Sequence, residues 1–320
     1  MFKFIPLEKS RLEGLLSLWE KEMGVDFPMR QSLFEQNSFD DENICKKSSC
    51  LAMDSNDQLV GFIIAKRWQE TMDVPMNPKT GWIQVLVVDS DFRNQGIGSR
   101  LLQHAETTLR AAGVEQIWLG KDTYHYFPGI PMQYEETMRW FEKKGYQYQT
   151  TEYDLIRHYQ VDEGTALPTI ENVSFSLLNA QEKDELLHFL KRCFPGRWEY
   201  EAKHYFQKGG TGREFVIAKK AGKIIGFCRI NDAKSPFIAQ NMYWSPLFTQ
   251  SMGGAGPLGI DANERGHGYG LAIVEAGLAF LRRRGINTIV IDWTGLVDFY
   301  KKLGYDIWKS YRTYIKEFEK

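Results

Sequence analysis

An internal repeat constrains this chain more than any other feature of its sequence. Residues 93–98 and 265–270 both read Arg-x-x-Gly-x-Gly, and they stand 172 residues apart. The same spacing aligns Gly113 with Gly285, each of which precedes an apolar run. Collinear matches at one offset predict two copies of a single folded unit.

The offset changes near the end of each copy. Residues 141–146 (FEKKGY) match residues 300–305 (YKKLGY) at an offset of 159 rather than 172. The difference predicts an insertion in the first copy at about residues 121–133 (KDTYHYFPGIPMQ). Its aromatic residues and prolines favour a rigid loop, which lines an acceptor pocket, covers the first CoA groove or packs as an ordinary loop at the domain interface.

Length and composition agree with two globular domains. A chain of 320 residues fits two units of ordinary size. We expect domains at residues 1–160 and 173–320, joined by a linker at residues 161–172 where polar residues and a proline interrupt the pattern. A net charge of -1 removes the general electrostatic argument for nucleic-acid binding.

Targeting and metal-binding signals are missing from the sequence. No apolar run approaches the roughly 20 residues of a membrane span, and the first residues do not read as a signal peptide. The cysteines lack the spacing of metal ligands; they are Cys45, Cys50, Cys193 and Cys228. We therefore expect a cytoplasmic protein with no metal, no nucleic-acid partner and no membrane partner, and the sequence leaves its oligomeric state undetermined.

Hydrophobic periodicity predicts nearly the same order of elements in both copies. In the first copy we expect strands at residues 2–6, 49–53, 59–66, 82–88, 116–120 and 148–156, and helices at residues 9–23, 96–113 and 135–144. In the second copy we expect strands at residues 214–219, 223–230, 259–261, 288–292 and 306–315, and helices at residues 181–193, 268–284 and 296–303. This order predicts an α/β protein, an α+β sandwich in which each domain has a mixed, mostly antiparallel sheet flanked by helices.

Each glycine motif lies between a predicted strand and a predicted amphipathic helix. Glycines allow a tight turn in which backbone N–H groups and the helix N-terminus point at one place, and this arrangement suits a pyrophosphate. Leu101 and Leu271 stand where a dinucleotide-binding motif has its third glycine. A phosphate-binding Gly-Lys-Ser/Thr sequence does not follow either motif.

These segments resemble the GNAT superfamily of acyl-CoA N-acyltransferases. VVDSDFRNQGIGSRLL and GIDANERGHGYGLAIV are similar to its pyrophosphate loop, and VDFYKKLGY is similar to its later helix. The resemblance covers nearly the whole chain as two tandem copies, a layout similar to that of mycothiol synthase and related bacterial two-domain acetyltransferases. It implies that acetyl-CoA is the cosubstrate. The residues that it places at acetyl-CoA are Val88, Arg93, Asn94, Gln95, Gly96, Ile97 and Gly98 in the first copy and Ile260, Arg265, Gly266, His267, Gly268, Tyr269 and Gly270 in the second.

The resemblance also implies the chemistry, in which an amine attacks the acetyl thioester and the tyrosine of the later motif acts as general acid. The second copy has Tyr300 at that position, whereas the first has Phe141, which carries no proton to donate. This difference predicts that the second copy is catalytic and that the first is degenerate, structural or regulatory. Asp292 ends a strand of the second copy, where the first has Gly120. Its carboxylate could deprotonate the amine or cap the following helix.

We therefore expect an N-acetyltransferase that moves an acetyl group from acetyl-CoA to a primary amine of a small molecule. Two alternatives stay open, namely a non-catalytic protein that binds or senses acyl-CoA, and an enzyme that acetylates a protein amine. No motif in the sequence identifies the acceptor.

Overall fold

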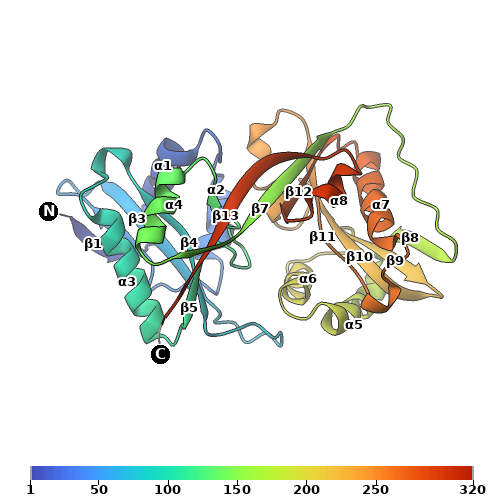
Figure 1. Ribbon diagram of the computed structural model, residues 1–320, viewed down its shortest axis with the longest axis horizontal. Helices are drawn as coiled ribbons and strands as arrows, with labels where there is room; N and C mark the ends of the chain where they lie inside the picture. Colours follow the sequence, from blue (N-terminus) through green and yellow to red (C-terminus); the bar gives the residue numbers. More distant parts are fainter. Residues whose placement is uncertain (1, 319–320) are drawn as a thin grey trace. The chain divides into compact units, whose positions relative to one another are not determined.

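The computed structural model describes residues 2–318, which form two compact units (Figure 1). The first unit contains the chain up to Thr71, Asn77–Glu152 and the C-terminal segment from Ser310. The second contains Met72–Met76 and Tyr153–Lys309. None of the helices among the described residues is long and apolar enough to cross a membrane.

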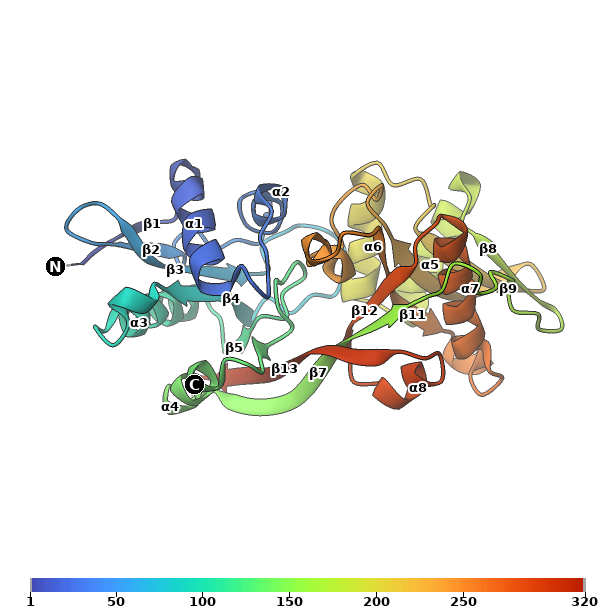
Figure 2. The same ribbon diagram turned by 90° about the horizontal axis from the view of Figure 1, so that it is seen from above.

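The first unit has one sheet with the strand order β1-β2-β3-β4-β5-β13, in which only β4 and β5 run parallel. Its elements are β1 (Lys3–Pro6), α1 (Leu12–Met23), α2 (Gln31–Phe34), β2 (Cys50–Met53), β3 (Leu59–Arg67), β4 (Thr80–Val88), α3 (Ile97–Ala111), β5 (Gln116–Leu119), β6 (Ile130–Pro131), α4 (Glu135–Lys143) and the start of β7 (Gln147–His158). Helices α1 and α2 lie on one face of this sheet, and α3 and α4 lie on the other (Figure 2).

The second unit repeats this plan with the strand order β7-β12-β11-β10-β9-β8, in which β11 and β12 are the parallel pair. Its elements are β8 (Val173–Leu177), α5 (Lys183–Cys193), α6 (Arg197–Gln207), β9 (Phe215–Lys220), β10 (Lys223–Asn231), β11 (Met252–Ile260), α7 (Tyr269–Arg283), β12 (Thr288–Thr294), α8 (Val297–Lys301) and the start of β13 (Asp306–Glu317). Helices α7 and α8 contribute to one hydrophobic core, and α5 and α6 contribute to another.

The two copies exchange their last strands. β7 ends the first copy in sequence, yet it pairs with β12 in the second unit and places Ile156 opposite Val290. β13 ends the second copy and pairs with β5 in the first unit, with Ile315 opposite Trp118. These two registers are equivalent, because the paired residues are related by the repeat offsets of 159 and 172.

The fold class predicted from the sequence is confirmed, since each unit is a mixed, mostly antiparallel sheet flanked by helices. The compact units differ from the contiguous halves 1–160 and 173–320, because each contains the last strand of the other copy. Hydrophobic periodicity indicates that a segment is a strand, but it does not indicate which strand lies beside it. Pairing across the sheet therefore decides the domain limits.

Most helices and strands lie within a few residues of their predicted bounds, but β11 differs. The sequence predicts a short strand at residues 259–261 after a glycine-rich approach, whereas β11 already begins at Met252. Glycines usually weaken a strand, which is why the pattern reads as a loop. Here they allow close packing: a Cβ on Gly259 would lie 2.4 Å from the Phe194 ring, and a Cβ on Gly254 would lie 2.1 Å from the Asn241 side chain.

Candidate active site

In both units the two parallel strands at the centre of the sheet diverge. Pairing of β4 with β5 ends at Ile83 and Leu119, although β4 continues to Val88. Pairing of β11 with β12 ends at Gly254 and Val290, and β11 continues in the same way. The divergence leaves backbone N–H and C=O groups of β4 and β11 without a strand partner on this side, and such groups need other partners.

The glycine turns that follow β4 and β11 have the same conformation. Gly96 and Gly268 have φ angles of 82° and 78°, and each directly precedes a helix, α3 or α7. This left-handed conformation favours glycine. A Cβ at either position would meet no atom within 4 Å, so the turns face open space. Backbone N–H groups at a helix N-terminus that face open space suit an anion.

The arginines of the two motifs brace these turns. Arg93 Nε donates to the carbonyl of Val88, and Arg265 Nε donates to the carbonyl of Ile260, each at 3.1 Å. Both arginines thereby tie the turn to the last residue of the central strand. The structure thus places the predicted acetyl-CoA residues of each copy on one strand end and one turn.

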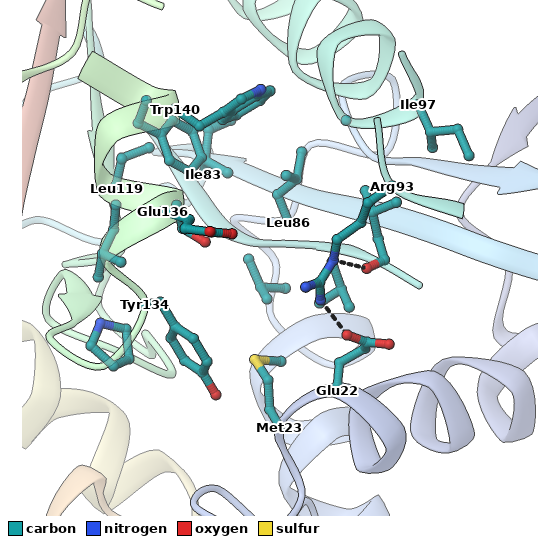
Figure 3. A pocket seen from close by; sticks show the side chains of 18 of the residues that line it. Glu22, Met23, Ile83, Leu86, Arg93, Ile97, Leu119, Tyr134, Glu136 and Trp140 are labelled. Carbon is teal, nitrogen blue, oxygen red and sulfur yellow. Dashed lines mark hydrogen bonds and ion pairs between the residues drawn. The ribbon is translucent and has the colours of Figure 1, made fainter. Parts of the chain in front are cut away.

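A cavity of about 520 Å³ opens in the first unit where β4 and β5 diverge (Figure 3). Apolar side chains, including Leu86 and Trp140, line much of it. Of the first-copy residues that the sequence assigned to acetyl-CoA, all except Gln95 line the cavity, namely Val88, Arg93, Asn94, Gly96, Ile97 and Gly98. The cavity therefore lies in the copy that the sequence predicts to be degenerate.

Glu22, near the end of α1, lines this cavity beside the glycine turn. Its carboxylate forms an ion pair with Arg93 (Figure 3). It also accepts the backbone N–H of Ser90 at 2.8 Å. Its side chain is only 6% exposed. Helix α1 aligns with α5 at an offset of 171, so the corresponding residue of the second copy is Cys193. An anion at the first turn therefore meets a buried carboxylate that the second copy lacks.

In the second unit, α8 carries Tyr300 into the core beside α7. Tyr300 is 5% exposed and packs against Tyr305 with the two ring centroids 6.3 Å apart. Burial is the main cause that raises the pKa of the Tyr300 hydroxyl above its ordinary value, and the nearby Cys228 thiol and Asp292 carboxyl raise it further. The hydroxyl therefore stays protonated at neutral pH and can donate a hydrogen bond.

Asp292 lies in a β-bulge of β12. The register between β12 and β7 shifts between Ile291 and Thr294, so that Asp292 and Trp293 stand opposite the single residue Asp154. Burial and then the charge of Asp154 raise the pKa of the Asp292 carboxyl to about 7. A carboxyl with a pKa near neutrality suits a general base.

The Asp292 carboxyl faces β11 just beyond the point where β11 and β12 separate. A Cβ on Gly256 would meet only one atom within 4 Å, Asp292 Oδ1 at 3.9 Å, so the space in front of β11 is open here. The Asn241 side chain hydrogen-bonds to Asp292 and donates to the Gly256 carbonyl at 3.4 Å. The Asp292 carboxyl therefore lies at this opening, and Tyr300 is near enough for the Asp292 charge to raise the pKa of its hydroxyl.

The alternative role for Asp292, capping the next helix, is not what the structure shows. Leu296 is the N-cap residue of α8, and its backbone N–H is bound by Thr294 Oγ1 at 3.0 Å. Asp292 is therefore not used as a helix cap.

The first unit lacks this chemistry at the equivalent positions. Gly120 corresponds to Asp292, and a Cβ there would lie 2.0 Å from the Phe127 carbonyl oxygen. The insertion that contains Phe127 is a buried aromatic loop whose Tyr126 and Phe127 pack on Trp19, with ring centroids 4.9 and 5.9 Å apart. Because Phe127 also lines the cavity, the loop forms part of the cavity wall.

Sequence reasoning missed helix α6 and Asp154. The signal for α6 was two pairs of oppositely charged residues, each four positions apart. The structure forms both ion pairs, Arg197–Glu201 at 2.7 Å and Glu199–Lys203 at 2.6 Å. For Asp154 no local signal exists, because its place depends on strand exchange. Among the described residues, no three His, Cys, Asp or Glu side chains are grouped as metal ligands.

The acetyltransferase (GNAT) family matches residues 13–127 and 183–305, one match in each copy. The chain belongs to this family. It is therefore an acyltransferase with two tandem GNAT domains, and the family uses acetyl-CoA.

Two relatives match this GNAT chain in sequence, one over most of its length and one over about half. A mycothiol acetyltransferase of Thermobispora bispora is 27% identical over 81% of this chain and 80% of its own length. An uncharacterized N-acetyltransferase of Methanocaldococcus jannaschii is 26% identical over 48% of this chain and 63% of its own length.

Solved structures share the whole tandem arrangement. A glucosamine N-acetyltransferase region in a fungal multi-domain GH3 β-N-acetylglucosaminidase has a TM-score of 0.88 and 26% identity over 98% of this chain. This GNAT chain spans 38% of that protein's chain. A tandem GNAT protein from the clavulanic acid biosynthesis pathway has a TM-score of 0.70 and 13% identity, covering 99% of this chain and 98% of its own, and it supports the fold alone.

Proposed function

We propose that the second copy transfers the acetyl group of acetyl-CoA to a primary amine of a small molecule, with Asp292 as general base and Tyr300 as proton donor. One observation carries this proposal. The Asp292 carboxyl, with a pKa of about 7, lies where β11 and β12 separate, and its charge acts on the Tyr300 hydroxyl, which stays protonated at neutral pH. At the glycine turn that follows β11, Cys193 stands at the position that Glu22 holds in the first copy.

Binding of the cosubstrate is assigned to the end of β11 and the turn before α7. In this proposal the pyrophosphate takes the backbone N–H groups around Gly266 and Gly268, where the positive end of the α7 dipole also favours an anion. Both glycines have positive φ angles, 86° and 78°, and a Cβ on either would meet open space.

The reaction then removes two protons from the acceptor nitrogen and adds one to the leaving sulfur. The acceptor arrives as an ammonium ion, since lysine-like amines have a pKa of about 10.4. The Asp292 carboxylate takes the first proton, the free amine attacks the thioester carbonyl carbon, and the C–S bond breaks as the C–N bond forms. The Tyr300 hydroxyl gives its proton to the leaving CoA thiolate, and the second proton of the nitrogen returns to the Tyr300 oxygen. The proton on Asp292 passes to solvent, so the products are an N-acetyl amide, CoA as the free thiol and one proton.

The comparisons support a small acceptor, and within that class we propose the amine of a glucosamine-like sugar. The solved structure at 26% identity is described as a glucosamine N-acetyltransferase region, and the relative at 27% identity is named for mycothiol, which supports a small-molecule acceptor. We also propose a cytoplasmic location, in keeping with four cysteines that are free thiols.

The test is CoA release from acetyl-CoA, followed with a thiol reagent, with D-glucosamine as the first acceptor and a lysine-containing peptide as the second. We expect turnover with glucosamine, and we expect Asp292→Asn to lower kcat/KM by about 10²- to 10⁴-fold, the usual contribution of general base catalysis. Turnover with the peptide alone would favour protein acetylation. Acetyl-CoA binding without turnover on any amine would favour a sensing protein and overturn the proposal.

A further inference from the structure

The strand exchange brings a residue of the first copy into the second unit's site. Asp154 belongs to β7, the strand that ends the first copy, and it is 5% exposed within the second unit. Its equivalent at the repeat offset of 159 is Thr313 on β13. A carboxylate so deeply buried is unusual unless it has a structural or functional task.

Asp154 holds the bulge that contains Asp292. Its Oδ1 accepts the backbone N–H of Trp293 at 3.0 Å, in the gap where two residues of β12 stand opposite one residue of β7. Trp293 has a φ of 43°, a left-handed conformation that a non-glycine residue adopts only when its surroundings impose it. Bulges of this kind re-aim side chains next to active sites. Here the bulge directs the Asp292 carboxyl toward Gly256.

The charged and titratable groups around Asp292 come from three elements. Asp154 on β7 has the largest effect on the Asp292 carboxyl after burial, and Glu201 on α6 has a smaller effect. Tyr300 on α8 lies close enough to be affected by the Asp292 charge. Glu201 is partly neutralised, because it pairs with Arg197 at 2.7 Å. Asp154 is therefore the neighbouring charge that most disfavours ionisation of Asp292.

We propose that Asp154 is a positioning residue for the second-copy site: it holds the β12 bulge and places a negative charge beside Asp292, so that the last strand of the first copy completes the catalytic arrangement of the second. This inference rests on the proposed function, since it concerns the same base. It explains why the site needs both copies in one chain. In the first unit, the equivalent Thr313 binds the backbone of Thr150 instead.

The experiment compares Asp154→Asn, Asp154→Ala and the matched Thr313→Val in the full chain. Asparagine keeps an oxygen that can accept the Trp293 N–H but removes the charge, whereas alanine removes both. The readouts are the pH profile of kcat/KM with acetyl-CoA and D-glucosamine, and the titration of the Asp292 side-chain carbon by ¹³C NMR, which needs no acceptor.

We expect the wild-type rate to rise with pH through about 7, and we expect Asp292→Asn to remove this rise. Asp154→Asn shifts the midpoint, in both readouts, to lower pH by about one unit or more, as removal of a like charge predicts. Asp154→Ala also lowers kcat at least about tenfold without changing the KM for acetyl-CoA, because the base is misplaced. Thr313→Val leaves the midpoint and kcat unchanged.

The outcomes separate this inference from the proposed function. An unchanged midpoint and kcat in both Asp154 variants, with the rise through pH 7 still abolished by Asp292→Asn, would overturn the role of Asp154 and leave the proposed function standing. Full activity of Asp292→Asn would instead overturn the proposed function. A shift produced by Thr313→Val as well would show a general effect of the exchanged strands and would also overturn the specific role of Asp154.

Discussion

The two copies share a frame and differ in a few side chains. Both have diverging parallel strands, a glycine turn with the same φ angles and an arginine bound to the end of the central strand. They differ where chemistry and charge are expected. The differing pairs, first unit then second, are Glu22 and Cys193, Gly120 and Asp292, Phe141 and Tyr300, and Thr313 and Asp154.

This difference shows that the binding cavity and the reactive side chains have separate structural origins. The first unit has a cavity of about 520 Å³ at the opening, although the residues that we propose as reactive in the second unit have no counterpart there. The opening is a property of strand divergence and glycine turns, which the backbone sets. Reactivity depends on individual side chains, so it can be lost in one copy while the fold is retained.

After the loss expected from Asp292→Asn, the largest effect is expected from the tyrosine position. Tyr300→Phe removes the hydroxyl near the leaving sulfur and is expected to lower kcat about 10²-fold, the lower range for a positioned proton donor. The matched change Phe141→Leu in the first copy should leave kcat unaltered. Steady-state kinetics with saturating acetyl-CoA measures both, and equal losses from the two variants would mean that the copies do not differ as described.

A smaller effect is expected from the glycine turns. A β-branched residue at a φ near 80° costs roughly 1–2 kcal/mol, so Gly268→Val and Gly96→Val should destabilise the chain by similar amounts in chemical denaturation. Only Gly268→Val should raise the KM for acetyl-CoA, by about tenfold or more, because it blocks the turn that serves catalysis. An equal KM for both variants would place the working cosubstrate site elsewhere.

Stability should depend on pH through Asp292. Its folded-state pKa of about 7 lies above the ordinary carboxyl value, so the folded chain binds more protons than the unfolded chain between about pH 4 and 7. This group therefore makes stability fall as pH rises through that window. Asp292→Asn should be more stable than the wild type at pH 8, and the difference should vanish near pH 4 in thermal denaturation. A difference that is constant across pH would contradict the raised pKa.

The smallest effect is expected from exchanging the residues beside the two turns. Glu22→Cys removes the carboxylate that pairs with Arg93 and should strengthen acetyl-CoA binding in the first cavity several-fold, since a buried like charge no longer opposes the pyrophosphate. Cys193→Glu should weaken binding in the second copy by a similar factor. Isothermal titration calorimetry with site stoichiometry resolves the two sites. Unchanged affinities would show that Glu22 does not weaken acetyl-CoA binding in the first copy.

Local patterns in the sequence predict much of the frame. The turn before α7 follows from its glycines, the inward faces of α3 and α7 follow from apolar spacing, and Tyr300 follows from the repeat with Phe141. Asp292 is also recognisable, because it ends a predicted strand. β11 was shortened in the prediction, since its glycines weaken the strand signal while packing against Phe194 requires them.

What the sequence by itself determined is the repeat, the fold class and the residues with chemistry to offer. The tertiary structure alone decided that β7 and β13 are exchanged, that Asp154 stands opposite the Asp292 bulge, and that Glu22 reaches Arg93. The physical reason is that periodicity and motifs report interactions between residues near each other in the chain. Strand partners, burial and the electrostatics that tune Asp292 arise from residues far apart in the chain, such as Glu22 and Arg93, 71 positions apart, and Asp154 and Trp293, 139 positions apart. Such residues meet only when the sheets assemble.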